Sequence, residues 1–464
     1  MDSKFMAVFV QAKRIIQLAW PIVITQLALS GMVTIDTIMA ARYSSVDMAA
    51  VGTSLGLWYP ISLFALGVLA GLGPIFSRDY GARNKRTGNS HFSNALVITT
   101  GLVAFTALLM LFKTPLLAPL AFDPAMLTIM HDYLFYLTLG LPGFCFFILY
   151  RVLNESMGNT RLLMWLQLAA LALNIPLNWM FIFGEFGAPE LGGAGAGIST
   201  TLLNYLLFFV IWYISNKHAN CRPYIKRASI KFVTVKKLQE LLKLGLPVGV
   251  TMFLEVALFG AVALAIGRYG PEAAAAHQVA INFASMMWMI PLSLSIATSV
   301  VIGQSMGAKS PLQAIQATKA GVYIAVCFAA VTATITIVGR HYVSLIYTQD
   351  VAVVEIATAL LIWAAIFQLS DATQCVTLGS LRGFKDTQKP MWFTIFSYWV
   401  IGFPAGWIFA ETTWFWHEPL GLHGYWIGLL TSLSCAAILL SLRLKRIIYK
   451  IRRISRFRHS PRVR

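Results

Sequence analysis

Apolar stretches long enough to cross a lipid bilayer recur along almost the whole chain. A helix needs about 20 mostly apolar residues to span the hydrocarbon core. A backbone inside lipid must satisfy its own hydrogen bonds, so we expect each stretch to be helical. The chain is therefore predicted to be an all-α polytopic membrane protein. About twelve spans are expected, near residues 15–41, 48–76, 92–113, 132–153, 162–184, 192–215, 244–267, 273–303, 318–339, 354–378, 390–411 and 420–442.

The composition supports this class. Of the 464 residues, 58% are hydrophobic and only 12% are charged, whereas a soluble protein carries about 25% charged residues. The first apolar run, residues 16–41, is too long for the apolar core of a signal peptide and lacks a cleavage site. We therefore expect no cleaved leader.

The basic residues predict the orientation in the membrane. Of the 36 Lys and Arg residues, 32 fall on one face of the predicted topology and four on the other. Basic loops face the cytoplasm, so both termini are predicted to be cytoplasmic. The basic segments at residues 217–243 and 443–464 are then topology signals lying against anionic lipid. The net charge of +18 therefore does not indicate nucleic-acid binding.

The sequence contains an internal repeat. LAWPIVIT at residues 18–25 matches LGLPVGVT at residues 244–251 with an offset of 226, and GAR at 81–83 matches GAK at 307–309 at the same offset. Each copy has an even number of spans, so both copies share one orientation and a pseudo-twofold axis is expected along the membrane normal. We predict two six-helix bundles, 1–216 and 244–442, joined by a basic linker at 217–243 and followed by a basic tail at 443–464.

Proline and glycine also recur inside the spans. Each proline removes a backbone hydrogen bond and permits a kink, which is either a movable hinge or a static bend. Small residues four apart, such as Gly67 and Gly71, predict close helix packing. The intraspan prolines are Pro21, Pro60, Pro142, Pro176, Pro247, Pro291 and Pro404.

Three acids remain inside the predicted spans: Asp36, Glu255 and Asp371. An acid at the centre of the bilayer costs about 2.5–3.5 kcal/mol on insertion scales. No Lys or Arg is expected in the spans to neutralise them, so the imbalance favours a bound cation or a proton over a salt bridge. The repeat places Leu29 opposite Glu255 and Val262 opposite Asp36, which predicts different roles for the two halves.

Several amides accompany these acids. Asn174 and Asn178 stand one helical turn apart on one face, where they either help to ligate an ion, hydrogen-bond Asp36, or tie helices together. Na⁺ requires several oxygen ligands, and Asn282 and Asp371 would supply them beside Glu255. Burial favours a protonated carboxyl group and a nearby cation favours the carboxylate. The residues therefore fit either a proton or Na⁺.

Other chemistries find little support in the sequence. GQSMG at residues 303–307 fits the G-x-S-x-G pattern, but an apolar helix precedes it where a hydrolase needs a strand-to-helix turn. His277 lacks an HExxH context, and no P-loop occurs. The five cysteines are scattered, which predicts neither a disulfide nor a zinc site. We expect no enzyme activity and no cofactor.

Five motifs together are specific. They are VTIDTIMA at 33–40, NIPLNW at 174–179, FLEVALF at 253–259, AAHQVA at 275–280 and GSLRG at 379–383. With the duplicated six-helix half, they closely resemble the multidrug and toxic compound extrusion (MATE) family, NorM-type branch. The resemblance runs from the first span to the last and excludes the basic tail.

The resemblance implies specific roles for the polar residues. In this family the acids matching Glu255 and Asp371 belong to the cation site of the C-terminal lobe. Relatives often carry Tyr where this chain has Phe367, so one hydroxyl group that might assist the cation is missing here. The resemblance also implies a polar cluster in the N-terminal lobe, formed by Asp36, Asn174, Asn178 and Thr200.

The implied function is secondary antiport. We expect export of organic cations and dyes by alternating access, in exchange for Na⁺ or H⁺, from a bacterial inner (plasma) membrane and by a monomer. Phe, Trp and Met side chains would hold cationic amphiphiles, with cation–π attraction adding about 0.5–2 kcal/mol. A flippase of lipid-linked precursors has similar architecture, but it would favour a cationic cavity. A membrane-embedded enzyme would need a nucleophile–base pair or a metal cluster.

Overall fold

The computed structural model describes residues 3–112, 123–414 and 417–459. All regular structure in these ranges is helical. Twelve helices among the described residues are long and apolar enough to cross a membrane, judged by length and composition. The predicted all-α class and its twelve spans are therefore confirmed. Residues 1–2 and 460–464, at the ends of the predicted N-terminal lobe and tail, lie outside the described ranges.

The helices extend past the predicted apolar cores, because polar residues at each end continue the helical backbone beyond the hydrocarbon. Their bounds are α1 (Ser3–Tyr43), α2 (Ser45–Ala70), α3 (Gly73–Gly81), α4 (Lys85–Leu111), α6 (Pro124–Met157), α7 (Thr160–Phe183), α8 (Gly193–Lys217), α9 (Arg222–Ile225), α10 (Val235–Ile266), α11 (Pro271–Gly307), α12 (Pro311–Tyr347), α13 (Val351–Gly383), α14 (Gln388–Ile395), α15 (Phe403–Glu411) and α16 (Leu422–His459). Short 3₁₀ turns η2 (Glu185–Gly187), η3 (Ile230–Phe232) and η4 (Gly267–Tyr269) and a π-helical segment η5 (Phe396–Gly402) complete the described elements.

The chain divides into two compact units. The N-unit is Pro21–Phe253, and the C-unit is Met1–Trp20 together with Leu254–Arg464. The boundary between the units therefore falls inside two helices. It crosses α1 at an intraspan proline and α10 shortly before Glu255. These units group the residues differently from the predicted lobes, which follow the sequence repeat and stay a prediction.

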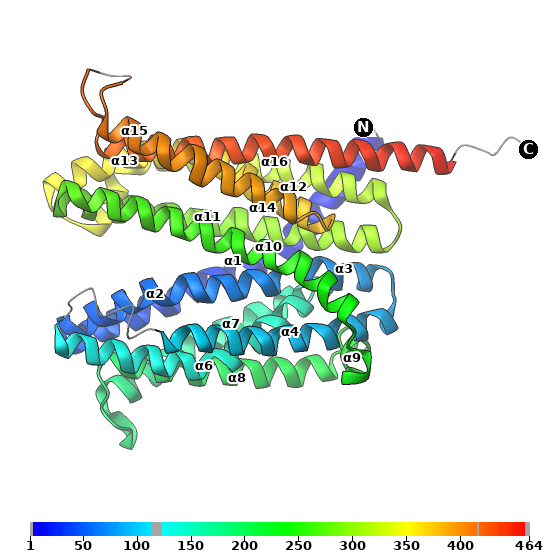
Figure 1. Cartoon of the computed structure of the whole chain (residues 1–464), viewed down its shortest axis with the longest axis horizontal. Helices are drawn as coiled ribbons and strands as arrows, with labels where there is room; N and C mark the ends of the chain where they lie inside the picture. Colours follow the sequence, from blue (N-terminus) through cyan, green and yellow to red (C-terminus); the bar gives the residue numbers. More distant parts are fainter. Residues whose placement is uncertain (1–2, 113–122, 415–416, 460–464) are drawn as a thin grey trace, which may run out of the picture. The chain divides into compact units, whose positions relative to one another are not determined.

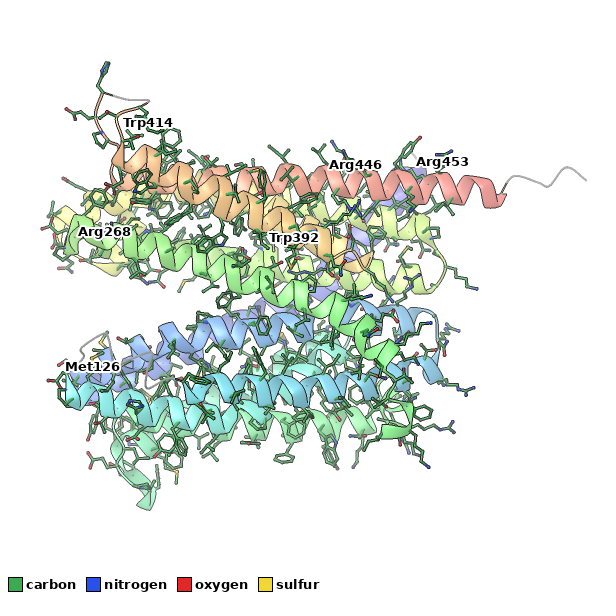
Figure 2. All side chains as sticks on the ribbon, viewed as in Figure 1. Met126, Arg268, Trp392, Trp414, Arg446 and Arg453 are labelled. Atoms are coloured by element: carbon green, nitrogen blue, oxygen red, sulfur yellow. The ribbon has the colours of Figure 1, made fainter. Side chains whose placement is uncertain are left out.

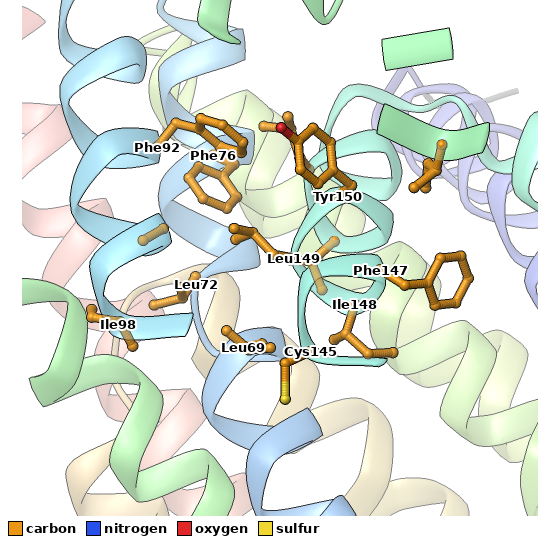
Figure 3. Close-up of a cluster of buried hydrophobic side chains, with 14 of the residues drawn as sticks. Leu69, Leu72, Phe76, Phe92, Ile98, Cys145, Phe147, Ile148, Leu149 and Tyr150 are labelled. Atoms are coloured by element: carbon orange, nitrogen blue, oxygen red, sulfur yellow. The ribbon is translucent and has the colours of Figure 1, made fainter. Parts of the chain in front are cut away.

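The N-unit has a continuous apolar core. Helices α2, α3, α4 and α6 contribute buried side chains to it, including Leu69, Phe76 and Phe92 (Figure 3). Phe92 of α4 packs edge-on against Tyr150 of α6, with ring centroids 5.3 Å apart. Because this cluster also takes in buried residues of α7, α8, α9 and α10, it fixes the backbone from which the polar residues of the unit project.

Glycines bring α2 against the first half of α10 within the N-unit. A Cβ atom added at Gly67 would lie 2.7 Å from the Gly249 Cα atom, and one added at Gly71 would lie 2.7 Å from the Gly245 Cα atom. Only glycine allows this close approach of two helix backbones. The packing role predicted for Gly67 and Gly71 is confirmed, and the first half of α10 is held to the N-unit.

The segment between α8 and α10 is docked on α4 rather than loose. Asn89 of α4 donates to the Pro223 carbonyl at 2.7 Å and accepts from the Arg227 amide at 3.0 Å. Asn94 donates to the Phe232 carbonyl at 3.1 Å and accepts from the Thr234 amide at 3.0 Å. We call these contacts the linker clamp. It pairs backbone groups of a segment that has little regular structure of its own.

The C-unit is built around α13, which packs against α11, α12 and α16, while α15 also lies along α16 (Figure 1). Trp426 of α16 is fully buried in its core. Arg14 of α1 donates to Gln304 of α11 at 2.5 Å, which ties the first part of α1 to this unit. The predicted basic tail continues α16 as far as His459 and carries exposed arginines, among them Arg446 and Arg453 (Figure 2).

Candidate functional site

Two of the predicted intraspan acids lie near each other in the C-unit. Glu255 is on α10 and is partly buried, and Asp371 is on α13 with only 7% of its surface exposed. Their charges interact. Within the described chain, Asp371 makes no hydrogen bond. Two like charges in an apolar interior repel strongly, so this arrangement requires a proton or a cation to balance it.

A tyrosine that the sequence analysis did not single out joins this pair. The Tyr398 hydroxyl group lies 3.5 Å from Oε1 of Glu255 and accepts a hydrogen bond from the side-chain amide of Gln374. Tyr398 is fully buried, and Gln374 is 2% exposed. Gln374 lies three residues after Asp371, on the same face of α13. A glutamine in an apolar span was a visible signal, whereas nothing in the sequence indicated Tyr398.

Two other residues expected near the pair make no hydrogen bond with it among the described residues. The Asn282 side chain on α11 is exposed and makes no hydrogen bond with either acid among the described residues. Phe367 stacks on Trp426, with ring centroids 5.7 Å apart and planes 19° apart, and the His277 ring meets the same Trp426 edge-on at 5.6 Å. His277 therefore belongs to an aromatic cluster, and a direct ligand role for Asn282 stays a prediction.

The expectation that no basic residue neutralises the acids inside the hydrocarbon stays a prediction, but two basic residues counted with the loops lie in long helices. Arg151 and Arg382 fall inside α6 and α13 rather than in loops, and both are buried. Arg151 falls at the end of the expected span 132–153, whereas Arg382 lies past the expected span 354–378 and is helical because α13 continues beyond its apolar core. Arg151 is neutralised by Glu155 at 2.8 Å.

Arg382 acts on the carboxylate site from a distance. Its charge interacts with that of Glu255, although no ion pair within 4.0 Å joins them in the described structure. Arg382 lies about three helical turns beyond Asp371 on α13. It therefore contributes a long-range positive potential and is not a contact counter-ion that would fill the site.

The N-unit brings the other four predicted residues together. Asn174 and Asn178 of α7 both donate to Oδ1 of Asp36, at 2.9 and 2.6 Å. Thr200 of α8 donates to Oδ2 of Asp36 at 3.3 Å. Asp36 is 5% exposed and both asparagines are fully buried. These bonds replace water around the carboxyl group, so they offset part of the cost of burying it. A transport role for this cluster stays a prediction.

Two tyrosines near Asp36 were not predicted. Tyr59 of α2 and Tyr133 of α6 lie close enough for electrostatic interaction with this carboxyl group. Tyr133 is 1% exposed. Each lies among other aromatic residues in an apolar span, and such residues occur throughout the chain, so the sequence held no signal for them.

The hydrolase-like pattern is helical in the structure. Ser305 lies inside α11 and donates to the Val301 carbonyl at 2.7 Å, one turn earlier. A nucleophile elbow requires a sharp strand-to-helix turn that exposes the serine. The hydroxyl group of this serine instead bonds to the backbone of its own helix. The pattern therefore does not form a nucleophile elbow.

The donor atoms of the carboxylate pair suit a hard cation or a proton. The described residues contain no group of three or more His, Cys, Asp or Glu that would hold a metal ion. What the C-unit offers is two carboxyl groups, a phenol hydroxyl and an amide. Oxygen donors of this kind prefer hard cations over transition metals.

Comparison with known proteins agrees with this architecture. The MatE family model matches residues 21–180 and 247–408, which is more than half of the chain and one match in each sequence repeat. The chain belongs to the MatE family. Relatives in the same family therefore provide the context in which the carboxylate pair is interpreted.

Full-length bacterial relatives are similar to this MatE protein. It is 35% identical over 447 residues to the probable multidrug resistance protein NorM of Mannheimia succiniciproducens, covering 96% of this chain and 95% of the relative. It is 36% identical over 438 residues to the multidrug resistance protein NorM of Vibrio cholerae, covering 94% and 95%. It is 37% identical over 441 residues to the probable multidrug resistance protein NorM of Shewanella oneidensis, covering 94% and 95%.

Solved structures share the fold. The eukaryotic MATE transporter AtDTX14 superposes with a TM-score of 0.85 at 18% identity, covering 96% of this chain and 99% of that one. The Vibrio cholerae MATE transporter VcmN in its bent form gives a TM-score of 0.84 at 19% identity, with coverage of 96% and 99%. At these identities the likeness concerns the fold alone.

Proposed function

We propose that this MatE family protein is a secondary-active multidrug efflux antiporter. It exports organic cations and dyes in exchange for Na⁺ or H⁺. The observation that carries the proposal is the pair of acids Glu255 and Asp371, whose charges interact inside apolar helices and which form no ion pair with a described basic residue. The names of its full-length relatives, multidrug resistance proteins, support drugs as the exported class.

The coupling follows from differential affinity. A cation or proton at the acid pair stabilises one conformational state, and a cationic drug that competes for the negative charge stabilises another. Exchange results because the two ligands favour different states. The Asp36 cluster in the N-unit would provide a second polar position on the same route, and aromatic side chains would add cation–π attraction of about 0.5–2 kcal/mol.

We place the protein in a bacterial inner membrane as a multi-pass monomer with both termini in the cytoplasm. The orientation rests on the bias of basic residues toward one face of the topology. Exposed arginines at the end of α16 are suited to anionic headgroups.

The decisive test is ethidium efflux from cells that express Glu255→Gln. This change keeps the size of the side chain and removes its negative charge, so stimulation of efflux by Na⁺ or by protons is expected to be lost. Glu272→Gln is the matched control, because Glu272 is exposed in the first turn of α11. Undiminished cation-stimulated efflux by Glu255→Gln, at equal membrane expression, refutes the assignment.

A second measurement identifies the coupling ion. Purified protein in liposomes is given a Na⁺ gradient or a proton gradient separately, and dye transport is followed by fluorescence. Transport driven by neither gradient, in protein that binds ethidium, contradicts antiport by this chain.

A further inference from the structure

The Tyr398 hydroxyl group is placed as a ligand would be. Its oxygen lies 3.5 Å from Oε1 of Glu255, which is longer than the 2.5–3.0 Å of an ordinary O–H···O hydrogen bond. Oxygens that share a cation lie farther apart than oxygens that share a proton. For metal–oxygen distances of about 2.3–2.6 Å, as around Ca²⁺, two ligands at right angles are about 3.3–3.7 Å apart. Na⁺ has nearly the radius of Ca²⁺, so the observed spacing fits a shared Na⁺.

A departure from regular helix geometry positions this tyrosine. Tyr398 lies in the π-helical segment η5 (Phe396–Gly402), directly before Pro404. Proline cannot donate to the preceding turn, and π-helical turns are frequent at functional sites. A Cβ atom added at Gly402 would come within 2.2 Å of the Ser432 Cβ atom on α16. The widened turn is therefore packed closely against a neighbouring helix, which fixes the backbone that carries Tyr398.

Gln374 completes an oxygen-rich set. Its side-chain nitrogen donates to the Tyr398 hydroxyl oxygen, which leaves a second lone pair on that oxygen for a cation. Without a cation the hydroxyl hydrogen is directed toward Glu255. Its Oε1 atom is buried and has no hydrogen-bond partner. The charge of Asp371 also acts on Tyr398. The Tyr398 oxygen is thus within reach of Glu255, and the charges of Glu255 and Asp371 both act on it, whereas a proton would need only one oxygen.

We propose that Tyr398 is a direct Na⁺ ligand of the Glu255–Asp371 site, with the Gln374 carbonyl oxygen beside it. The proposal rests on the proposed antiport function and gives it a specific ion. Tyr398 supplies the hydroxyl group that Phe367, stacked on Trp426, lacks. The widened turn at η5 exists to aim this hydroxyl group.

The test uses purified full-length protein and radioactive Na⁺ in equilibrium dialysis. Tyr398→Phe removes only the hydroxyl group and is expected to raise the Kd for Na⁺ about 10-fold, the effect of losing one contact to a charged group. The Na⁺ concentration that gives half-maximal dye efflux is expected to rise by about the same factor as the Kd. Tyr425→Phe is the matched control: it removes another buried tyrosine hydroxyl of the C-unit, bonded to Glu411 at 3.0 Å, and should leave the Kd unchanged.

Gln374→Met provides a second variant in case Tyr398→Phe does not fold, and it too should raise the Kd for Na⁺. An unchanged Kd in a folded Tyr398→Phe or Gln374→Met protein overturns the proposal. Absence of Na⁺ binding by the wild type also overturns it. In either case antiport itself survives if Glu255→Gln still abolishes cation-stimulated efflux, so the two ideas fail separately.

Discussion

Replacing both Asn89 and Asn94 with alanine is expected to release the segment between α8 and α10 and to expose the Cys221 thiol. Each asparagine makes two hydrogen bonds to the backbone of this segment. The double variant therefore removes the four bonds of the linker clamp. Cys221, which belongs to this segment and is fully buried, reports the release.

The magnitude follows from the number of bonds. A hydrogen bond contributes about 0.5–1.5 kcal/mol net, so four contribute about 2–6 kcal/mol. This corresponds to an increase of roughly 30-fold to 10⁴-fold in the population with the segment released. The lower figure applies if water replaces the lost partners well.

The thiol chemistry amplifies the readout. Burial raises the pKa of Cys221 to about 12, although the hydrogen bond from Asn159 opposes the shift. The thiolate is the reactive form. At pH 8 its fraction is about 10⁻⁴ in the docked state and roughly one quarter in a free thiol of pKa ~8.5, a difference of about 10³-fold. The docked state holds the Cys221 proton more tightly than the released state does. The stability that this protonated thiol adds to docking is therefore fully present below about pH 8.5 and is lost as the pH rises toward 12.

The assay is the rate of N-ethylmaleimide labelling, followed by mass spectrometry, in protein whose other cysteines are replaced by alanine. The double variant should label at least 30-fold faster than the parent protein at pH 8. Thr100→Ala on the exposed face of α4 is the control, because Thr100 bonds only its own helix. Equal labelling rates in the double variant and the parent, or rapid labelling of the parent itself, would refute the clamp.

Two further predictions concern packing and polar burial in the N-unit. Asn178→Leu removes the shorter amide bond to Asp36 and should lower the free energy of unfolding by about 1.5–3 kcal/mol; an unchanged Tm in detergent would contradict this. Gly71→Ala should cost about 1–3 kcal/mol, because its Cβ atom would lie 2.7 Å from the Gly245 Cα atom. Gly101→Ala, with open space around it, should instead raise stability by about 0.5–1 kcal/mol, and similar Tm shifts in the two glycine variants would show that the close contact is absent.

The sequence predicted which polar residues share a face of one helix better than it predicted which residues of other helices they contact. Asp36 with Asn174 and Asn178 was among the alternatives left open, and the structure joins them. Asn282 was expected beside the acid pair and makes no bond with it, because a helical period says which residues share a face but not which faces meet. Arg382 was assigned to a loop, since hydropathy marks the apolar core of a helix and not its ends.

Length and hydropathy alone determined the twelve helices, because a bilayer leaves a chain of this composition no other way to satisfy its backbone. They also isolated Glu255 and Asp371, since an acid in an apolar span is conspicuous in any arrangement. Only the tertiary structure decided that Tyr398 and Gln374 stand beside these acids. A π-helical turn and the close packing of Gly402 on Ser432 bring Tyr398 there, and this packing joins segments that are apart in the chain.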